Sequence, residues 1–316
     1  MIPTTHPSER PDLVLVNPVA GAGRARKALP ALQRFAQENG WRADFQLTTS
    51  VDDLRQRACK GAKNGHGRIF VVGGDGTFQV LINGIGPHSN TVLGVIPAGG
   101  GNDFATSLGI PLDTVAAARM LLEGSDCSLD AVRVKTADGA VRLYTGGGGV
   151  GLDAEASRYA GGIYRNVRGR LRYVLSAIRA LTGFHSMQVR VQTDARDETD
   201  ITDIKGHALL VAVLNTPSYG AGVRLAPGAI MDDGKLDLVL LDNLGLFDVL
   251  AMLPALLLRG DVHSKRLQRR TVKRVRIETD RPCAFHADGE IVGATPVEVE
   301  IVPGALRVLC PRQKQR

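Results

Sequence analysis

The chain has 316 residues, of which 44% are hydrophobic and 22% are charged. This composition lies near the globular average and argues against disordered, fibrous and membrane-spanning classes, while the length predicts two domains. The net charge of +7 favours acidic partners such as anionic lipids, phosphorylated ligands or nucleic acid. Aromatic residues make up only 4% of the chain, which disfavours a nucleic-acid binder that stacks on bases.

The first part of the chain alternates short apolar runs with helical patterns. We predict strands at residues 13–16, 45–47, 68–72 and 92–96, and helices at 25–39, 51–63, from 77 onward, and at 114–123. This alternation predicts an α/β domain over residues 11–129, with a mostly parallel sheet covered on both faces. Residues 1–10 read as a flexible tail, and they contain no apolar segment of the kind found in a signal peptide.

From about residue 130 the pattern changes to short β-type runs separated by turn residues. We predict strands at residues 131–135, 142–145, 187–192, 207–215, 235–241, 275–279, 297–301 and 306–309, and helices at 170–182 and 246–258. The expectation is a mainly antiparallel β-sandwich over residues 130–310, followed by a basic tail at 311–316.

The cysteines and apolar runs bear on where the protein acts. The four cysteines are scattered without a CxxC pair, which suits a reducing cytosol and gives no zinc signature. No apolar run reaches the roughly 18–20 residues that cross a bilayer. We therefore expect a cytoplasmic protein without a transmembrane helix.

Three glycine-rich segments follow predicted strands of the first domain. They begin at Asn17, Gly73 and Pro97, and each leads toward a helix. Glycine allows tight turns, and the start of a helix attracts anions. Loops after successive parallel strands gather at the carboxyl edge of the sheet, where such folds bind nucleotides. A plain turn remains the alternative for the first loop taken alone.

Asp75 stands among the glycines of the second loop. A carboxylate beside a phosphate would repel it, so its presence implies an intervening cation, for which Mg²⁺ is the favoured candidate. The alternative is a tight turn in which Asp75 only caps the following helix. Asp103, in the third loop, is expected near the same crevice.

These residues resemble the diacylglycerol kinase catalytic domain, whose family includes bacterial lipid kinases and the sphingosine and ceramide kinases. The resemblance rests on residues 73–77 with Asn83-Gly84, on Asn17-Pro18, and on residues 97–105. It continues through Asp130, residues 146–153, the helix around Tyr173, residues 232–237 and residues 288–290. It implies a kinase that binds ATP between its two domains.

The resemblance also implies roles for individual residues. The positions matched to ATP binding are Asn17, Pro18, Val19, Ala20, Gly21, Thr48, Gly73, Gly74, Gly76, Thr77, Phe78, Gln79, Val80, Gly100 and Asn102. Asp75, Asp103 and Asp130 would form a carboxylate and Mg²⁺ network, and Ile230, Asp233 and Lys235 would hold a structural Mg²⁺.

Asp288-Gly289-Glu290 matches the catalytic tripeptide of the family. A hydroxyl that attacks the γ-phosphoryl group needs a proton acceptor, and carboxylates serve in that role. By analogy we favour Glu290 as the base, with Asp288 positioning the nucleophile or metal, although the sequence leaves the choice open. Outside this family context, an Asp-Gly hairpin turn beside an exposed Glu would be the simpler interpretation.

The chain departs from the family pattern at three positions. Gln79 and Gly100 stand where relatives often have Glu and Thr, and Gly146 stands where Asn is usual. Losing the hydroxyl at position 100 removes a contact worth roughly 0.5–1.5 kcal/mol. Because the acidic residues remain, the sequence predicts a modified active kinase.

Basic residues near apolar ones suggest an anionic membrane surface as the place of action. One group follows the 246–258 stretch, between residues 259 and 276, and another lies at 158–172. For 246–258, core packing is the alternative to membrane contact.

The functional alternatives are an NAD-kinase-like enzyme and a non-catalytic ATP- or lipid-binding protein. Nucleic acid is not expected as a partner, and a homodimer is left open.

Overall fold

The computed structural model describes residues 10–164, 167, 170–183, 186–194, 201–218, 223–242, 248 and 266–312. It divides into two compact units: residues 1–129 with 304–316, and residues 130–303. The predicted helix at 246–258 lies outside the described residues, apart from Asp248.

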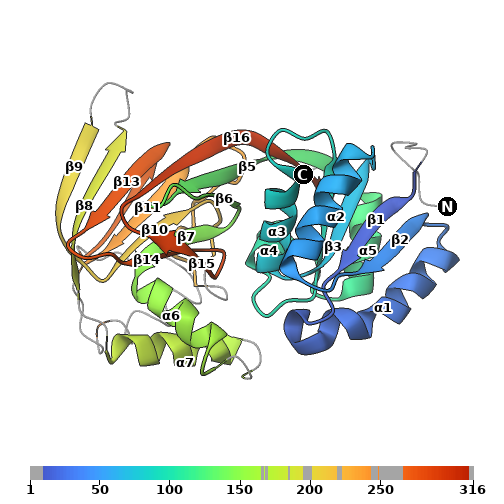
Figure 1. The fold of residues 1–316 in the computed structure, drawn as a ribbon, viewed down its shortest axis with the longest axis horizontal. Helices are drawn as coiled ribbons and strands as arrows, with labels where there is room; N and C mark the ends of the chain where they lie inside the picture. The colour runs from blue at the N-terminus through green and yellow to red at the C-terminus, as the bar shows by residue number, and fades with distance from the viewer. Residues whose placement is uncertain are drawn as a thin grey trace. The chain divides into compact units, whose positions relative to one another are not determined.

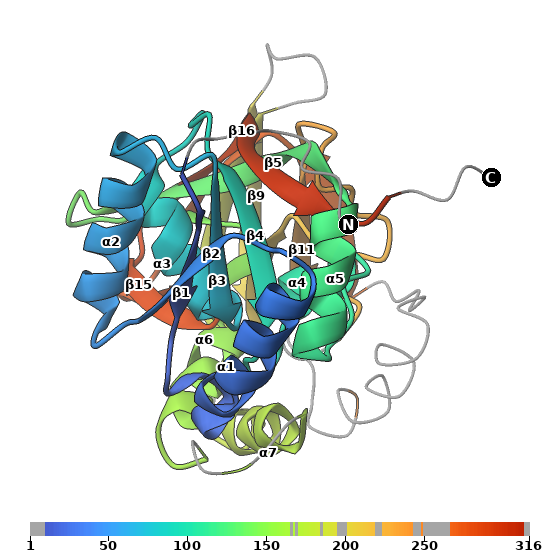
Figure 2. The ribbon, with the colours of Figure 1, turned by 90° about the vertical axis from the view of Figure 1, so that its right-hand side faces the viewer.

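Unit 1 is a parallel α/β layer structure. Its elements are β1 (Asp12–Val16), α1 (Ala20–Glu38), β2 (Ala43–Leu47), α2 (Val51–Lys63), β3 (Arg68–Gly73), α3 (Asp75–Ile85), β4 (Val92–Pro97), α4 (Asp103–Ser107) and α5 (Thr114–Glu123). The strands run in the order β2-β1-β3-β4, and all their pairings are parallel. Figure 2 shows α2 and α3 on one face of this sheet and α1 and α5 on the other.

The near-continuous burial of its inner strands accounts for the position of the unit 1 sheet between two layers of helices. Strands β1 and β4 are buried at every position, as their continuous apolar sequences predict for a sheet covered on both faces. The C-terminal part of β16 (Val297–Cys310) adds a further parallel strand beside β4, with Arg307 opposite Val92. Residues 304–310, which the sequence predicts to be part of the second domain, pair with β4 and group with unit 1.

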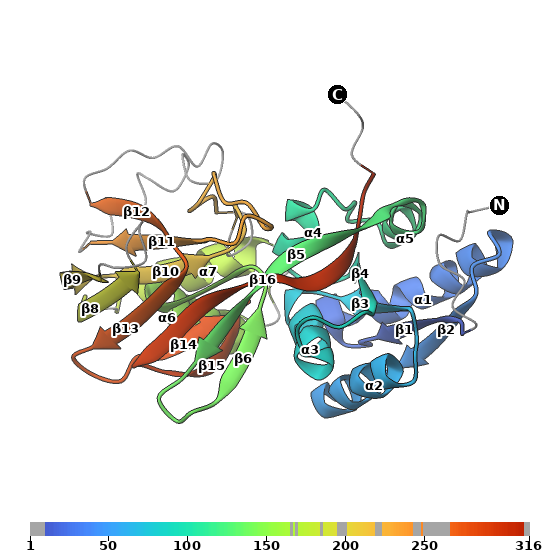
Figure 3. The same ribbon diagram turned by 90° about the horizontal axis from the view of Figure 1, so that it is seen from above.

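Unit 2 is built from two mainly antiparallel sheets and a helix pair. Its elements are β5 (Ser125–Lys135, shared with unit 1), β6 (Val141–Tyr144), β7 (Gly147–Gly151), α6 (Leu152–Gly161), α7 (Arg170–Leu181), β8 (Met187–Asp194), β9 (Ile201–Ala208), β10 (Leu210–Leu214), β11 (Leu236–Leu241), β12 (Leu267–Val272), β13 (Arg274–Thr279), β14 (Ala284–Ala287), β15 (Glu290–Ala294) and the first part of β16. One sheet contains β16-β13-β8-β9, and the other has the order β12-β11-β10-β7-β14-β15 (Figure 3).

The two sheets of unit 2 share an apolar core. Alternate residues of β8, β11 and β13 are buried in one cluster with Tyr144 and Phe285. This period-2 burial is what a sandwich strand with one inner face requires. The fold class expected from the sequence, an α/β domain followed by an antiparallel β-sandwich, is confirmed.

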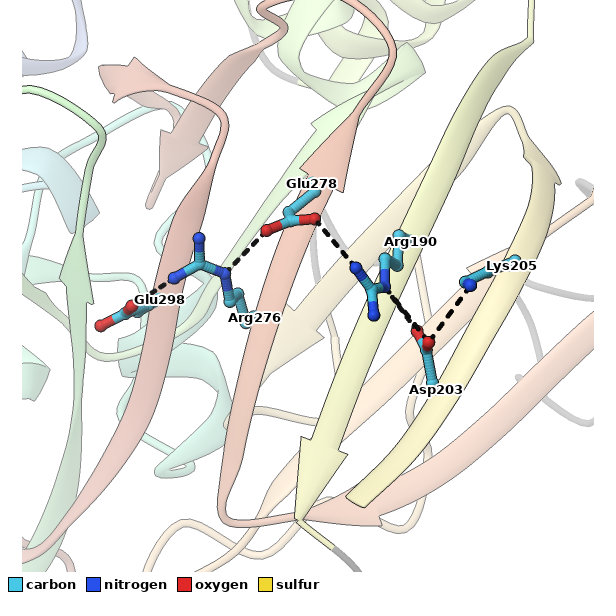
Figure 4. A network of polar contacts seen from close by, with 6 residues as sticks. All are labelled: Arg190, Asp203, Lys205, Arg276, Glu278 and Glu298. Carbon is cyan, nitrogen blue, oxygen red and sulfur yellow. Dashed lines mark hydrogen bonds and ion pairs between the residues drawn. The ribbon is translucent and has the colours of Figure 1, made fainter.

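The outer face of the β16-β13-β8-β9 sheet carries a ladder of opposite charges (Figure 4). Arg276 pairs with Glu298 at 2.7 Å and with Glu278 at 2.9 Å, and Arg190 lies 3.0 Å from Asp203. Links from Arg190 to Glu278 and from Asp203 to Lys205 are longer, at 3.9 and 3.5 Å. The links of Arg276 to Glu298, Arg190 to Asp203 and Arg190 to Glu278 join neighbouring strands, and such cross-strand pairs stabilise strand pairing modestly.

Candidate functional site

The three glycine-rich loops of unit 1 meet backbone to backbone. A Cβ added to Gly74 would lie 2.8 Å from the Cα of Gly99, and one added to Gly99 would lie 2.3 Å from the Cα of Gly74. A Cβ on Gly21, whose φ is +59°, would lie 2.0 Å from the carbonyl oxygen of Ala98. These glycines therefore permit contact between loops, so that the three strand ends form one continuous backbone surface.

Side chains connect the same loops. The amide of Asn17 donates to the hydroxyl of Thr77 at 3.1 Å, and Arg24 donates to the carbonyls of Gly21 and Gly99. The buried hydroxyl of Thr48 donates to the carbonyl of Val16 at 3.2 Å. The first loop differs from its prediction, because α1 begins at Ala20 and contains left-handed backbone from Gly21 to Gly23 before regular helix resumes.

Asp75 holds the third loop against the second. Its carboxylate accepts from the backbone N–H of Asn102 at 2.8 Å and of Phe104 at 3.0 Å. The N-cap of α3 is Gly74, without a side-chain cap, so the simple capping role is not what the structure shows. Burial raises the pKa of the Asp75 carboxyl, and the backbone N–H donors partly offset this by favouring the ionised form.

The residues matched to ATP binding separate into two groups. Asn17, Gly21, Gly74 and Asn102 belong to the connected loops described above. Phe78 and Gln79 are instead buried in α3, where Phe78 stacks on Phe104 with ring centroids 4.5 Å apart. Both side chains are buried, and their expected contact with ATP stays a prediction.

The Asp288-Gly289-Glu290 segment forms the turn of the β14–β15 hairpin. Asp288 and Gly289 have φ values of 48° and 87°, the positive values that two-residue hairpin turns of type I′ require. Among the described residues, Asp288 is one of four non-glycine residues with a positive φ. Asp and Asn tolerate this left-handed conformation better than most other residues.

Asp288 binds the start of the glycine-rich strand β7. Its carboxylate accepts from the backbone N–H of Thr145 at 3.0 Å, of Gly146 at 2.9 Å and of Gly147 at 3.2 Å. A Cβ at Gly146 would lie 2.9 Å from an oxygen of this carboxylate. The unusual glycine at position 146 thus leaves room for the Asp288 contact.

Glu290 begins β15 immediately after this turn. The residue is exposed, and its carboxylate has no hydrogen-bond partner among the described residues. Desolvation by the surrounding protein raises the pKa of Glu290 above its usual value of 4.5. A carboxylate with these properties can accept a proton from an approaching hydroxyl.

A buried pair beside the hairpin was not recognised from the sequence. Nε2 of His286 lies 2.9 Å from a carboxylate oxygen of Asp153, and their side chains are 1% and 8% exposed. His286 comes from β14, and Asp153 from the first turn of α6. The signals available in the sequence were the position of His286 two residues before Asp288 and the acidic start of the helix after Gly151.

The acidic residues that the structure describes do not by themselves form a metal cage. Within the described part of the chain, no group of three or more His, Cys, Asp or Glu side chains is arranged to hold a metal ion. Mg²⁺ is usually held by one or two carboxylates together with substrate phosphates. Each Asp75 oxygen already accepts from one backbone N–H, so a metal ion would have to use the remaining lone pairs. The Mg²⁺ role of Asp75 and Asp103 stays a prediction.

The third member of the expected network, Asp130, has a local role in unit 2. Its carboxylate accepts from the backbone N–H of Gly234 at 2.7 Å, which holds the turn that contains the expected structural Mg²⁺ site. In that turn Ile230 and Asp233 are exposed, and Asp233 accepts from the N–H of Lys235 at 3.1 Å. Oxygen atoms of Ile230, Asp233 and Lys235 are of the type that Mg²⁺ prefers, and a structural Mg²⁺ at this turn stays a prediction.

Comparisons with known proteins match most of the length of these two units. The diacylglycerol kinase catalytic domain matches residues 11–134, and the YegS C-terminal NAD kinase beta sandwich-like domain matches residues 146–310. The chain is 28% identical over 305 residues to a diacylglycerol kinase of Bacillus subtilis, covering 95% of this chain and 96% of that protein. It is likewise 28% identical to a diacylglycerol kinase of Mycobacterium tuberculosis over 303 residues, covering 94% of each.

A solved structure shows the same fold. The crystal structure of a diacylglycerol kinase from Bacillus anthracis superposes with a TM-score of 0.71 at 21% identity, covering 95% of this chain and 97% of that one. The order of the domains and the full coverage agree with the resemblance found in the sequence. The chain belongs to the family of bacterial lipid kinases in which a diacylglycerol kinase catalytic domain precedes a YegS-type β-sandwich.

Proposed function

We propose that this protein is an ATP-dependent kinase that transfers the γ-phosphoryl group to the hydroxyl of a lipid, with a diacylglycerol-like acceptor. The observation that carries the proposal is the match of the two family models, to residues 11–134 and 146–310, together with the anchored Asp288-Gly289-Glu290 turn. The family match supports kinase chemistry, and the turn supplies a proton acceptor for an alcohol.

The loops of unit 1 are the proposed phosphate site. Their glycines keep the backbone free of side chains, Asn17 and Thr77 are joined across two of the loops, and the start of α3 favours negative charge. Asp75 and Asp103 are proposed to hold Mg²⁺ together with the phosphates. When bound, the metal neutralises charge on the β- and γ-phosphate oxygens.

Glu290 is the proposed general base. The Asp288 carboxylate accepts from three backbone N–H groups, whereas Glu290 is exposed and its carboxylate accepts no hydrogen bond from the described residues. The lipid hydroxyl oxygen bonds to the γ-phosphorus while its proton passes to Glu290. The bond between the γ-phosphorus and the bridging oxygen breaks, and ADP leaves with the phosphorylated lipid as the other product.

An anionic membrane surface is the proposed source of the acceptor. No described helix is both long and apolar enough to cross a bilayer. Ile163, after α6, is 72% exposed, and Leu171 on α7 is 57% exposed, with the cationic side chains of Arg158 and Arg179 in the same helix pair. Exposed apolar residues beside cations suit contact with anionic headgroups.

The test is to incubate the protein with ATP labelled at the γ-phosphate and a total lipid extract, and to identify the labelled product. Transfer to a lipid with a free hydroxyl is expected, and the Glu290→Gln variant should give almost none. Labelling of NAD without labelling of lipid would favour the NAD-kinase alternative. Binding of ATP and Mg²⁺ without transfer to any lipid would favour a non-catalytic binding protein.

A further inference from the structure

A glycine on the neighbouring strand β7 leaves space for the Asp153–His286 pair. His286 lies opposite Gly149 in the pairing of β14 with β7. A Cβ at Gly149 would lie 2.4 Å from the Asp153 carboxylate, so glycine there lets the carboxylate reach the ring. The second carboxylate oxygen accepts from the backbone N–H of Ala154 at 2.7 Å, which fixes the orientation of the group.

The pair faces away from the apolar core. Phe285 and Ala287 are buried in the cluster between the two sheets, and strand alternation directs His286 to the opposite face, where α6 packs against β14 (Figure 1). Burying a His–Asp pair gains little stability, since desolvation offsets much of the attraction, and an apolar pair would fill the space at lower cost. Its value is therefore in fixing geometry.

Two anchors consequently act on one short hairpin. The Asp288 carboxylate ties the turn to the start of β7, and His286 ties β14 to the first turn of α6. The β14–β15 register is irregular between Phe285 and His286, so regular ladder hydrogen bonds alone do not fix this hairpin. Glu290 is the first residue after the turn, and its position follows that of the hairpin.

We propose that Asp153 and His286 are positioning residues, which hold the β14–β15 hairpin so that Glu290 meets the attacking hydroxyl. This inference rests on the proposed function, since it assigns the pair a part in the same reaction. Neither side chain needs to touch the substrate. Loss of the pair would displace Glu290 while leaving the nucleotide loops of unit 1 intact.

The experiment compares His286→Leu, His286→Gln and a control, Val275→Ala, in the full chain. Val275 is a fully buried residue of β13, which pairs with β16 and β8, so its truncation destabilises the shared core of unit 2 without removing a hydrogen bond of the hairpin. His286→Leu is expected to lower kcat by at least about tenfold with the KM for ATP within about twofold, because a misplacement of about 1 Å can cost roughly 100-fold. His286→Gln, which keeps an N–H donor toward Asp153, should recover much of the loss.

Hydrogen exchange of the backbone amides gives a second measurement that does not depend on activity. His286→Leu should speed exchange at residues 145–147 and 284–294, and Val275→Ala should not do so selectively. If His286→Leu and Val275→Ala lower kcat equally, or if exchange at the hairpin is unchanged, the positioning role is wrong. If the wild-type protein phosphorylates no lipid, the proposed function fails, and the exchange data still decide whether the pair fixes the hairpin.

Discussion

Asp75 in unit 1 and Asp288 in unit 2 make the same kind of contact in different settings. Each carboxylate accepts hydrogen bonds from backbone N–H groups of a glycine-rich segment. Asp75 stands on the first turn of α3, within loops that are also joined by Asn17–Thr77 and by glycine contacts. Asp288 stands on a two-residue turn in left-handed backbone, so the hairpin depends on fewer anchors.

We therefore expect the loops around Asp75 in unit 1 to be more rigid than the hairpin turn around Asp288 in unit 2. The loops of unit 1 have several independent connections, and loss of one would leave the others. In unit 2 a small change near the turn would move Glu290. Substitutions at the two carboxylates should therefore differ in what they change, and the following measurements test this.

The largest effect is expected for Asp75→Ala. Because it removes both the anchor of the third loop and the proposed Mg²⁺ ligand, it should lower phosphoryl transfer by at least about 10³-fold and weaken ATP binding. The measurement is transfer to lipid together with calorimetric titration of ATP.

Asp113→Ala is the matched control, since this N-cap of α5 accepts from the N–H of Ala116. It should cost about 1 kcal/mol of stability and leave transfer intact. Retained transfer in Asp75→Ala would refute the assignment.

Glu290→Gln should lower turnover by about 10²–10⁴-fold, the range expected for loss of a general base. The dissociation constant for ATP should stay the same, because the proposed nucleotide site lies in unit 1. Steady-state kinetics and nucleotide binding measure the two effects. Glu298→Gln, which removes a carboxylate from the outer charge ladder, is the control. An equal fall in turnover in both variants would contradict the role of Glu290.

Asp288→Asn should lower turnover by about tenfold, less than Glu290→Gln. Asn tolerates the left-handed backbone, but its amide nitrogen cannot accept hydrogen bonds from the N–H groups of residues 145–147. Gly146→Ala should act in the same direction, because its methyl group would crowd the Asp288 carboxylate. Gly206→Ala, at a site with nothing within 4 Å, is the control. Normal kinetics in both Asp288→Asn and Gly146→Ala would show that the anchor is dispensable.

The smallest effect concerns stability in unit 2. Burial, together with the charge of Asp233, raises the pKa of Asp237 from 3.8 to about 6, and Arg269 partly opposes the shift. Since the folded state binds this proton more tightly than the unfolded state, ionised Asp237 costs stability above pH 6, and the cost fades as the pH falls toward 4. Asp237→Asn should therefore stabilise the metal-free protein, measured with a chelator present, at pH 7.5 by about 1–2 kcal/mol, allowing for partial exposure. Denaturant unfolding should show this difference shrinking to near zero at pH 4; a constant difference would contradict the shift.

The sequence predicted most regular elements of unit 1, because their apolar periodicity is strong. The predicted bounds of α2 and α5 agree with the structure. It failed where tertiary pairing decides the conformation. Residues 147–151 were read only as a glycine-rich run and form strand β7, and the predicted strand at 207–215 covers the end of β9 and all of β10. Two predicted strands, at 297–301 and 306–309, are one strand, β16, which continues through Pro303 and Gly304.

The candidate site was predictable to the extent that it lies in motifs. Asp75 stands in a short glycine-rich pattern that itself indicates phosphate chemistry. Asp288 and Glu290 were assigned through the family resemblance, because the residues alone favour a plain hairpin turn. The contact of Asp153 with His286 could not be foreseen, because the two residues are 133 positions apart and only the β7–β14 pairing brings them together. The sequence also did not indicate that Gly146 leaves space for the Asp288 carboxylate, because the two residues meet only in the folded protein.

The charge ladder of Figure 4 has a consequence for how unit 2 reaches a single fold. Arg276 and Glu278 alternate with the buried Ile277 along β13. If this strand slid by one residue, Ile277 would face water, the charged side chains would enter the core, and the partners on β16 and β8 would no longer meet. The ladder thus discriminates against misaligned sheets, and it does so through the cost of wrong pairings more than through the small strength of each right one.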